Sequence, residues 1–227
     1  MAMRTEELET GSLGRVKNPK GAGAVKASNK SYGAADIEVL EGLEPVRKRP
    51  GMYIAGTDTP AGLHQLVFEI LDNSVDEAMN GHADEITIRL LPDDKVSISD
   101  NGRGIPVELH PQYKVSALEL VLTKLHAGGK FGGEESGYKI SGGLHWVGVS
   151  VVNALSDWLE VTVERDGEKW IQEYKRGIPQ YKAKKIGTSR RHGTTVAFKP
   201  DATIFTEGIS FDYNRVLDHY RQQCYLN

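Results

Sequence analysis

Apolar residues recur along this chain with two different periods, and the changes of period predict the elements. Over residues 60–81 they return every three or four positions, which is typical of a helix with one buried face. Over residues 85–100 they alternate on either side of Pro92-Asp93-Asp94, which predicts a β-hairpin. The same rules predict further helices at about 37–48, 116–126, 147–155 and 212–226, and strands at 159–165, 169–175 and 194–199.

This order of elements, with a second hairpin turn at Asp166-Gly167, favours an α+β fold: a two-layer sandwich with helices on one face of a mixed β-sheet. Residues 1–31 contain no aromatic side chain and cannot bury enough apolar surface to order themselves. We therefore expect a disordered tail over 1–31 and one domain over 32–227. Its first segment, about 32–40, is expected to form an N-terminal arm.

The predicted helix over 60–81 carries polar side chains in register. Glu69, Asn73 and Asp76 are spaced so that they form one stripe opposite the apolar side. A carboxylate one turn from a carboxamide can hold a water molecule beside a hydrated cation, as hydrolysis of a nucleotide phosphate requires. The alternative is an ordinary solvated helix face.

The predicted hairpin ends in an acid. Val96, Ile98 and Asp100 share one side of the second strand, so the carboxylate points toward the core and needs a hydrogen-bond donor. The amino group of a bound base would serve. The alternative is a glycine turn over 101–104 in which the acid caps a neighbouring amide.

A glycine-rich segment covers residues 127–148, where eight of the 21 residues from Gly128 onward are glycine. With Lys130, Lys139 and His145 and a helix to follow, such a loop can bind phosphate through backbone amides. A flexible linker is the alternative. Two common nucleotide motifs are absent: Gly129-Lys130 is followed by Phe131 rather than Ser or Thr, and residues 102–104 lack the third glycine of a dinucleotide fingerprint.

In this order, Glu69–Asn73, Asp100–Gly104 and residues 127–148 resemble the ATP-binding motifs of the gyrase, heat-shock chaperone, histidine kinase and mismatch-repair (GHKL) ATPases. The longer stretches 40–54, 62–78, 141–156 and 193–196 resemble the N-terminal ATPase domain of bacterial type IIA topoisomerases more closely. That family includes DNA gyrase B and its topoisomerase IV counterpart. The resemblance implies the GHKL (Bergerat) fold.

The resemblance also implies roles. Glu69 matches the general base, Asn73 the Mg²⁺ ligand, and Asp100 the acceptor of the adenine amino group, supported by Thr194. The rim over the base matches Gly104, Ile105 and Pro106, with Arg103 beside it. The lid and phosphate loop of the ATP site match Lys130, Tyr138, Lys139, Gly142, Gly143, Leu144, His145, Val147 and Gly148. Tyr32 matches a tyrosine on the arm that reaches the nucleotide of the partner subunit. Arg103, Pro106 and Arg165 match the mouth of the pocket that binds inhibitors.

Three positions depart from the family pattern. Trp146 stands where the family usually has glycine, which puts turnover in more doubt than binding. Gln65 replaces a frequent histidine, so any help from that side chain in orienting water is expected to be absent or weaker. Residues 132–137 make the lid slightly longer, which is expected to add only mobility.

The resemblance implies ATP and Mg²⁺ as cofactors and an ATP-driven role in DNA strand passage and supercoiling. It implies as partners a second copy of the chain, the gyrase A or topoisomerase IV breakage-reunion subunit, DNA through the holoenzyme, and aminocoumarin-type inhibitors. In the family a lysine from a following domain completes the site, so we expect ATP binding with slow hydrolysis. Two alternatives stay open: a chaperone-type or repair-type ATPase, and a binding-only module in which Trp146 impairs turnover.

Composition changes this picture little. A net charge of −3 and 39% hydrophobic residues suit a soluble globular protein, and the single cysteine suits a reducing cytoplasm. No apolar run reaches the ~18 residues of a membrane span. A single cysteine, Cys224, excludes an internal disulfide. The charge balance is not that of a dedicated DNA-binding module. The basic clusters Arg47–Arg49 and Lys182–Arg191 are interpreted as solvated loops or helix ends.

Overall fold

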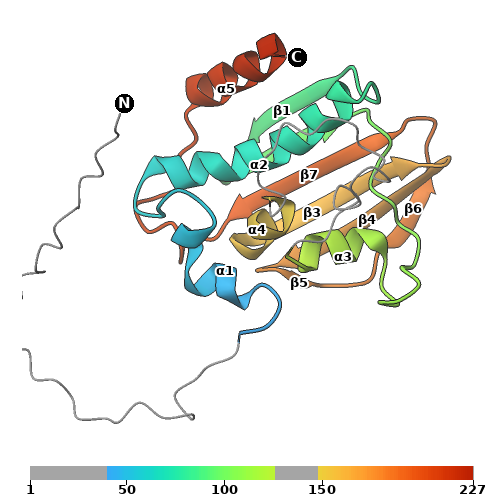
Figure 1. Ribbon diagram of the computed structural model, residues 1–227, viewed down its shortest axis with the longest axis horizontal. Helices are drawn as coiled ribbons and strands as arrows, with labels where there is room; N and C mark the ends of the chain where they lie inside the picture. The colour runs from blue at the N-terminus through green and yellow to red at the C-terminus, as the bar shows by residue number, and fades with distance from the viewer. Residues whose placement is uncertain (1–39, 126–147, 227) are drawn as a thin grey trace, which may run out of the picture. The chain divides into compact units, whose positions relative to one another are not determined.

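The computed structural model describes residues 40–125 and 148–226, with side chains of the last helix described as far as residue 223. Helices cover one face of an antiparallel β-sheet (Figure 1). The predicted tail and arm, and most of the glycine-rich segment, lie outside the described residues. In chain order the elements are α1 (Glu44–Lys48), the 3₁₀ turn η2 (Pro50–Met52), α2 (Pro60–Met79), β1 (Ile86–Leu91), β2 (Lys95–Asp100), α3 (Ala117–Thr123), α4 (Gly148–Ala154), β3 (Ser156–Arg165), β4 (Glu168–Lys175), β5 (Ile178–Pro179), β6 (Lys184–Thr188), β7 (Gly193–Pro200) and α5 (Tyr213–Leu226).

The strand order explains how distant parts of the chain meet. The sheet runs β1-β2-β7-β3-β4-β5, and β6 pairs with β4. The last long strand, β7, therefore lies in the middle, with Val196 opposite Ile98 of β2 on one side and opposite Val161 of β3 on the other. The expected two-layer α+β sandwich is confirmed. The sheet was expected to be mixed, but every described strand pair is antiparallel, because β7 returns between β2 and β3 and runs opposite to both.

Both predicted hairpins are confirmed. Asp93 and Asp94 have φ of 59°, and the second turn has Asp166 at 53° and Gly167 at 80°. Acidic, amide and glycine residues tolerate these left-handed angles best, so the turns close where the sequence places them.

The interpretation of Lys182–Arg191 as a loop or helix end was wrong in part. Residues Lys184–Thr188 form the edge strand β6. Its lysines give no alternating apolar signal, although charged side chains are a common way to protect a sheet edge from further pairing.

The core lies between the helices and the covered face of the sheet. Val67 and Leu71 of α2 are fully buried, as are Val161 of β3 and Phe198 of β7. This packing holds α2 across the sheet and presents its remaining sides to α4 and α5.

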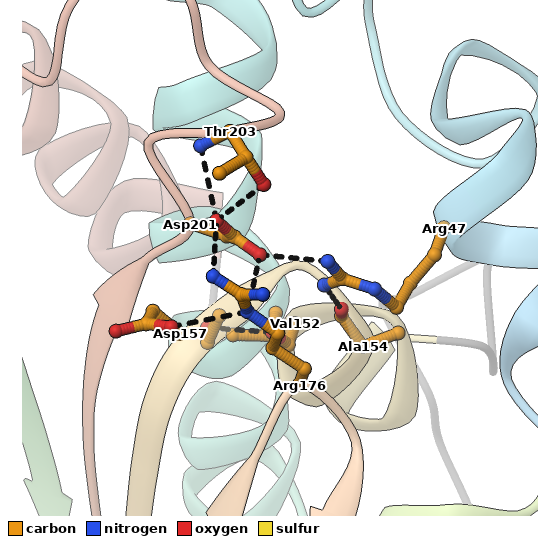
Figure 2. Close-up of polar contacts among 8 residues, drawn as sticks. Arg47, Val152, Ala154, Asp157, Arg176, Asp201 and Thr203 are labelled. Carbon is orange, nitrogen blue, oxygen red and sulfur yellow. Dashed lines mark hydrogen bonds and ion pairs between the residues drawn. The ribbon is translucent and has the colours of Figure 1, made fainter.

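A buried carboxylate ties α1 to the sheet (Figure 2). Asp201, 1% exposed, accepts hydrogen bonds from Arg47 Nη2 at 2.7 Å and from Thr203 Oγ1 at 2.7 Å, and Arg176 Nε lies 3.0 Å from it. Arg47 also donates to the Ala154 carbonyl at 2.6 Å, at the end of α4. Arg47 was therefore wrongly interpreted as solvated, because its partner lies 154 residues away in sequence.

We expect Asp201→Ala to lower the free energy of unfolding by about 3 kcal/mol, because it leaves two guanidinium groups without their shared buried partner. Chemical denaturation at pH 7 measures the change. Asp157→Ala is the matched control. Asp157 pairs with the same Arg176 but is partly exposed, so its loss should cost less than about 1 kcal/mol. Equal losses in both variants would contradict the role given to Asp201.

In the unsubstituted chain, protonation of Asp201 in acid should remove part of the same stabilisation. Burial alone would raise the pKa of Asp201, but the hydrogen bonds from Thr203 and Arg47 outweigh burial and lower it. A folded pKa below the unfolded value of about 3.9 gives stabilisation that is present above that pH and is lost as the pH falls through the folded pKa.

Candidate functional site

The polar stripe of α2 is the first half of the site. Glu69 is half-buried and Asn73 is exposed, and Asn73 Nδ2 donates to the Glu69 carbonyl at 2.8 Å. Asp76 does not belong to the exposed stripe as expected, because it is 2% exposed. After α2 the backbone amides of residues 80–83 donate to the last carbonyls of the helix, at Asp76, Glu77 and Ala78. The stripe continues instead at Glu77, two turns beyond Glu69.

Two neighbours fix the Glu69 carboxylate. Gln65 Nε2 donates to Glu69 Oε1 at 2.6 Å, so the glutamine at this position orients the acid directly. A contact of this kind was not expected where the family often has histidine. On the other side, Gly148 begins α4 so close that a Cβ there would lie 2.6 Å from Glu69 Oε2. Glycine at 148 therefore gives the carboxylate its space.

Asp100, at the end of β2, is the second half of the site. Its Oδ1 accepts from the Gly102 amide at 2.9 Å and the Thr194 amide at 3.3 Å, and its Oδ2 accepts from Ser74 Oγ at 3.0 Å. The two interpretations of this acid from the sequence are compatible, and its contact with a bound base stays a prediction. It caps a neighbouring amide, and it also shares the core-facing side of Val96 and Ile98, which are both buried.

The pKa of Asp100 distinguishes it among the carboxylates of the site. Burial, opposed by the hydrogen bonds from Gly102, Ser74 and Thr194, raises the pKa of the Asp100 carboxyl, and the negative charge of Glu77 adds to the rise. A half-buried acid with a raised pKa and several fixed donors is a common sign of a binding site.

Two glycines let the strands approach this closely. A Cβ at Gly193 would overlap the Asp100 carbonyl oxygen, and its φ of +133° is in the region that favours glycine. A Cβ at Gly102 would lie 2.9 Å from Glu77 Oε2. Both positions therefore need glycine to bring β7, β2 and α2 together.

Arg103 is held by an acid that sequence reasoning missed. Its Nε and Nη2 donate to the two carboxylate oxygens of Glu77 at 3.1 and 2.8 Å, and its backbone amide donates to Glu77 at 3.1 Å. Such a paired geometry fixes a guanidinium plane. The sequence contained one signal for Glu77: it follows Glu69 and Asn73 at the same spacing of four residues, which places it on the same side of the helix.

The remaining rim residues converge on the same loop. Thr194 Oγ1 accepts from the Ile105 amide at 3.2 Å, and Arg165 Nη1 donates to the Gly104 carbonyl at 3.0 Å. Pro106 is exposed beside them. Nine predicted site residues lie outside the described residues: Tyr32, Lys130, Tyr138, Lys139, Gly142, Gly143, Leu144, His145 and Val147. In the described part of the chain, no three His, Cys, Asp or Glu side chains form a group able to hold a metal ion.

Comparison with known proteins identifies the family of this chain. Residues 58–204 match the family model described as histidine kinase-, DNA gyrase B-, and HSP90-like ATPase, so the chain belongs to this ATPase family. Within the family it is similar to DNA gyrase B proteins of bacteria and plants, which confirms the resemblance to the type IIA topoisomerase ATPase domain.

Three such relatives show the extent of the similarity. The chloroplastic/mitochondrial gyrase B protein of Nicotiana benthamiana is 56% identical over 203 residues, which are 88% of this chain and 28% of the relative. The gyrase B proteins of Treponema pallidum (strain Nichols) and Staphylococcus aureus are 54% and 52% identical over 86% and 87% of this chain, and 30% of each relative. The chain thus spans less than a third of these relatives. Among its described residues, no helix is long and apolar enough to cross a membrane.

Proposed function

We propose that this chain binds Mg²⁺-ATP between the end of β2 and the polar stripe of α2, as the ATP-hydrolysing part of a gyrase B-like topoisomerase. The observation that carries the proposal is the hydrogen bond from Ser74 Oγ to Asp100 Oδ2, which joins the buried end of β2 to α2 at the residue after Asn73. The Asp100 carboxylate suits a purine amino group, and the Glu69 and Asn73 side chains suit a phosphate with its metal ion.

The adenine end depends on acceptors with fixed positions. Asp100 is restrained by three donors, so its remaining acceptor capacity points in one direction and can receive the adenine amino group. The Thr194 hydroxyl supports the same edge of the base. Gly104, Ile105 and Pro106 provide an apolar rim over the base. Arg103, Pro106 and Arg165 border the mouth, where aminocoumarin-type inhibitors are proposed to bind.

The phosphate end depends on α2. Glu69, oriented by Gln65, is the proposed general base for the water that attacks the γ-phosphate. Asn73 supplies an amide oxygen of the kind that Mg²⁺ accepts, in a site where phosphate oxygens and water provide most ligands. The bound metal ion would neutralise charge on the phosphates, and the side chains of the chain contribute mainly by positioning.

A nucleotide titration tests this function. We expect calorimetry to show binding of a non-hydrolysable ATP analogue at least about a hundredfold tighter than the matching GTP analogue. Guanine presents a carbonyl where adenine has its amino group, and a carboxylate acceptor rejects it. Equal affinity for the two analogues would remove the adenine contact from the proposal.

Gly148→Ala should lower ATP turnover by about tenfold or more, because the new Cβ displaces the Glu69 carboxylate. The flexible end of Glu69 can move aside, so the melting temperature should change little. Turnover is measured with protein in excess over labelled ATP. Gly187→Ala is the control, since no described atom lies within 4 Å of its Cβ and its φ is ordinary. Unchanged turnover in Gly148→Ala would separate Glu69 from catalysis.

The activity of the whole protein is proposed from its relatives, which are named as DNA gyrase B proteins. ATP would drive dimerisation with a second copy and DNA strand passage together with the gyrase A or topoisomerase IV breakage-reunion subunit, in the cytoplasm. Supercoiling of relaxed plasmid by the full-length protein with its partner tests this. ATP-dependent relaxation without supercoiling would favour the topoisomerase IV assignment.

A further inference from the structure

The last helix, α5, lies along α2 on the covered face of the sheet (Figure 1). The His219 ring of α5 stacks on Phe68 of α2, with centroids 3.8 Å apart and an interplanar angle of 18°. His219 Nε2 also lies 3.5 Å from Asp72 Oδ1. Stacked rings combined with a polar contact define one orientation of the two helices.

A second contact holds the start of α5. His64, 1% exposed, accepts a hydrogen bond at Nε2 from the Asp212 amide at 2.8 Å, while its Nδ1 contacts the Pro60 carbonyl at 2.6 Å. The Phe211 ring meets His64 edge-on at 6.1 Å. The segment that enters α5 is therefore attached to the first turns of α2.

These contacts lie next to the proposed catalytic stripe. His64, Phe68 and Asp72 are spaced by four, so they form one stripe of α2. Each directly precedes a residue of the neighbouring stripe: Gln65, Glu69 or Asn73. Because a helix moves as a unit, a shift of the first stripe shifts the second by a similar amount.

Another side of α5 faces the edge of the sheet. A groove of about 360 Å³ separates α5 from the edge strand β1, and it is lined by Ile86, Ile88, Leu90, Tyr213, Val216, Leu217 and Tyr220. On the α2 side, the position of α5 is fixed by the stacked His219 ring and by the hydrogen bond from Asp212 to His64.

We propose that His219 is a positioning residue: its stacking on Phe68 and its contact with Asp72 couple α5 to α2 and place Glu69 and Asn73 for ATP and its metal ion. This inference rests on the proposed function for the roles of Glu69 and Asn73, but the helix contact itself does not depend on it.

The test compares His219→Ala with Asp218→Ala, an exposed neighbour on the same helix. In the nucleotide-free chain, amides of residues 66–75 should exchange with deuterium about two- to tenfold faster in His219→Ala than in Asp218→Ala. Mg²⁺ should increase the affinity for a non-hydrolysable ATP analogue about threefold less in His219→Ala than in Asp218→Ala. The affinity for the analogue without Mg²⁺ should be the same in both variants. The kcat for ATP hydrolysis should fall about tenfold, which is more than the roughly threefold rise in KM for Mg²⁺-ATP.

His219→Phe separates positioning from general stability. It retains a ring over Phe68 and should recover most of the amide protection and turnover. Equal exchange rates in His219→Ala and Asp218→Ala would overturn the inference, whatever the nucleotide affinity and turnover of the two variants. Faster exchange with unchanged magnesium dependence and turnover would also overturn it. If Glu69→Ala hydrolyses ATP normally while exchange still differs, the proposed function fails instead.

Discussion

Asp100→Asn is expected to lower the affinity for ATP about a hundredfold or more. The Gly102 and Thr194 amides keep an acceptor on their side of residue 100, so the new NH₂ group must occupy the Oδ2 position. There it would face the adenine amino group, donor against donor, in a half-buried site where an unmade hydrogen bond is costly. Isothermal calorimetry with a non-hydrolysable analogue measures the change.

Asp93→Asn is the matched control for this variant. It makes the same chemical change in the hairpin turn that precedes β2, at a φ of 59° that asparagine tolerates well. It should bind the analogue like the unsubstituted chain. If Asp100→Asn bound as tightly as this control, the purine would have to be recognised elsewhere.

Glu69→Gln is expected to reduce ATP turnover about a thousandfold, while affinity for ATP stays within about twofold. The amide retains an oxygen to accept from Gln65 Nε2, so the geometry of α2 is preserved and only the proton acceptor is lost. Single-turnover hydrolysis with protein in excess is the suitable measurement, because it separates the chemical step from product release.

Glu41→Gln, an exposed position in front of α1, serves as the control and should leave both quantities unchanged. Turnover in Glu69→Gln near that of the control would exclude Glu69 as the base. A parallel loss of nucleotide affinity would instead indicate that Glu69 contributes to binding.

Local periodicity predicted most elements well. The expected helix at 60–81 is α2, and the expected hairpin is β1 and β2 with its turn in the predicted place. The predicted helix over 116–126 is shorter in the structure, because Ser116 caps its start by accepting from the Glu119 amide and the helix ends at Thr123. Elements without a periodic apolar signal, β5 and β6, were not predicted.

The site was only partly readable from the sequence. Strand parity placed Asp100 toward the core, and helical spacing joined Glu69 to Asn73, because both rules act over a few residues. Ser74, Glu77 and Gln65 were missed as contacts of these residues. Their roles depend on which side of α2 faces β2 and α4, and no local pattern contains that information.

The sequence by itself determined the short-range features of this protein: the phases of α2 and the hairpin, the left-handed turns, and the motifs that identify an ATPase of this family. Only the tertiary structure decided that β7 lies between β2 and β3, that Asp201 joins Arg47 to Arg176, and that α5 packs on α2 beside Glu69. The physical reason is range. Backbone sterics and side-chain period act between near neighbours, whereas strand order, buried ion pairs and helix packing depend on contacts between residues up to 154 positions apart.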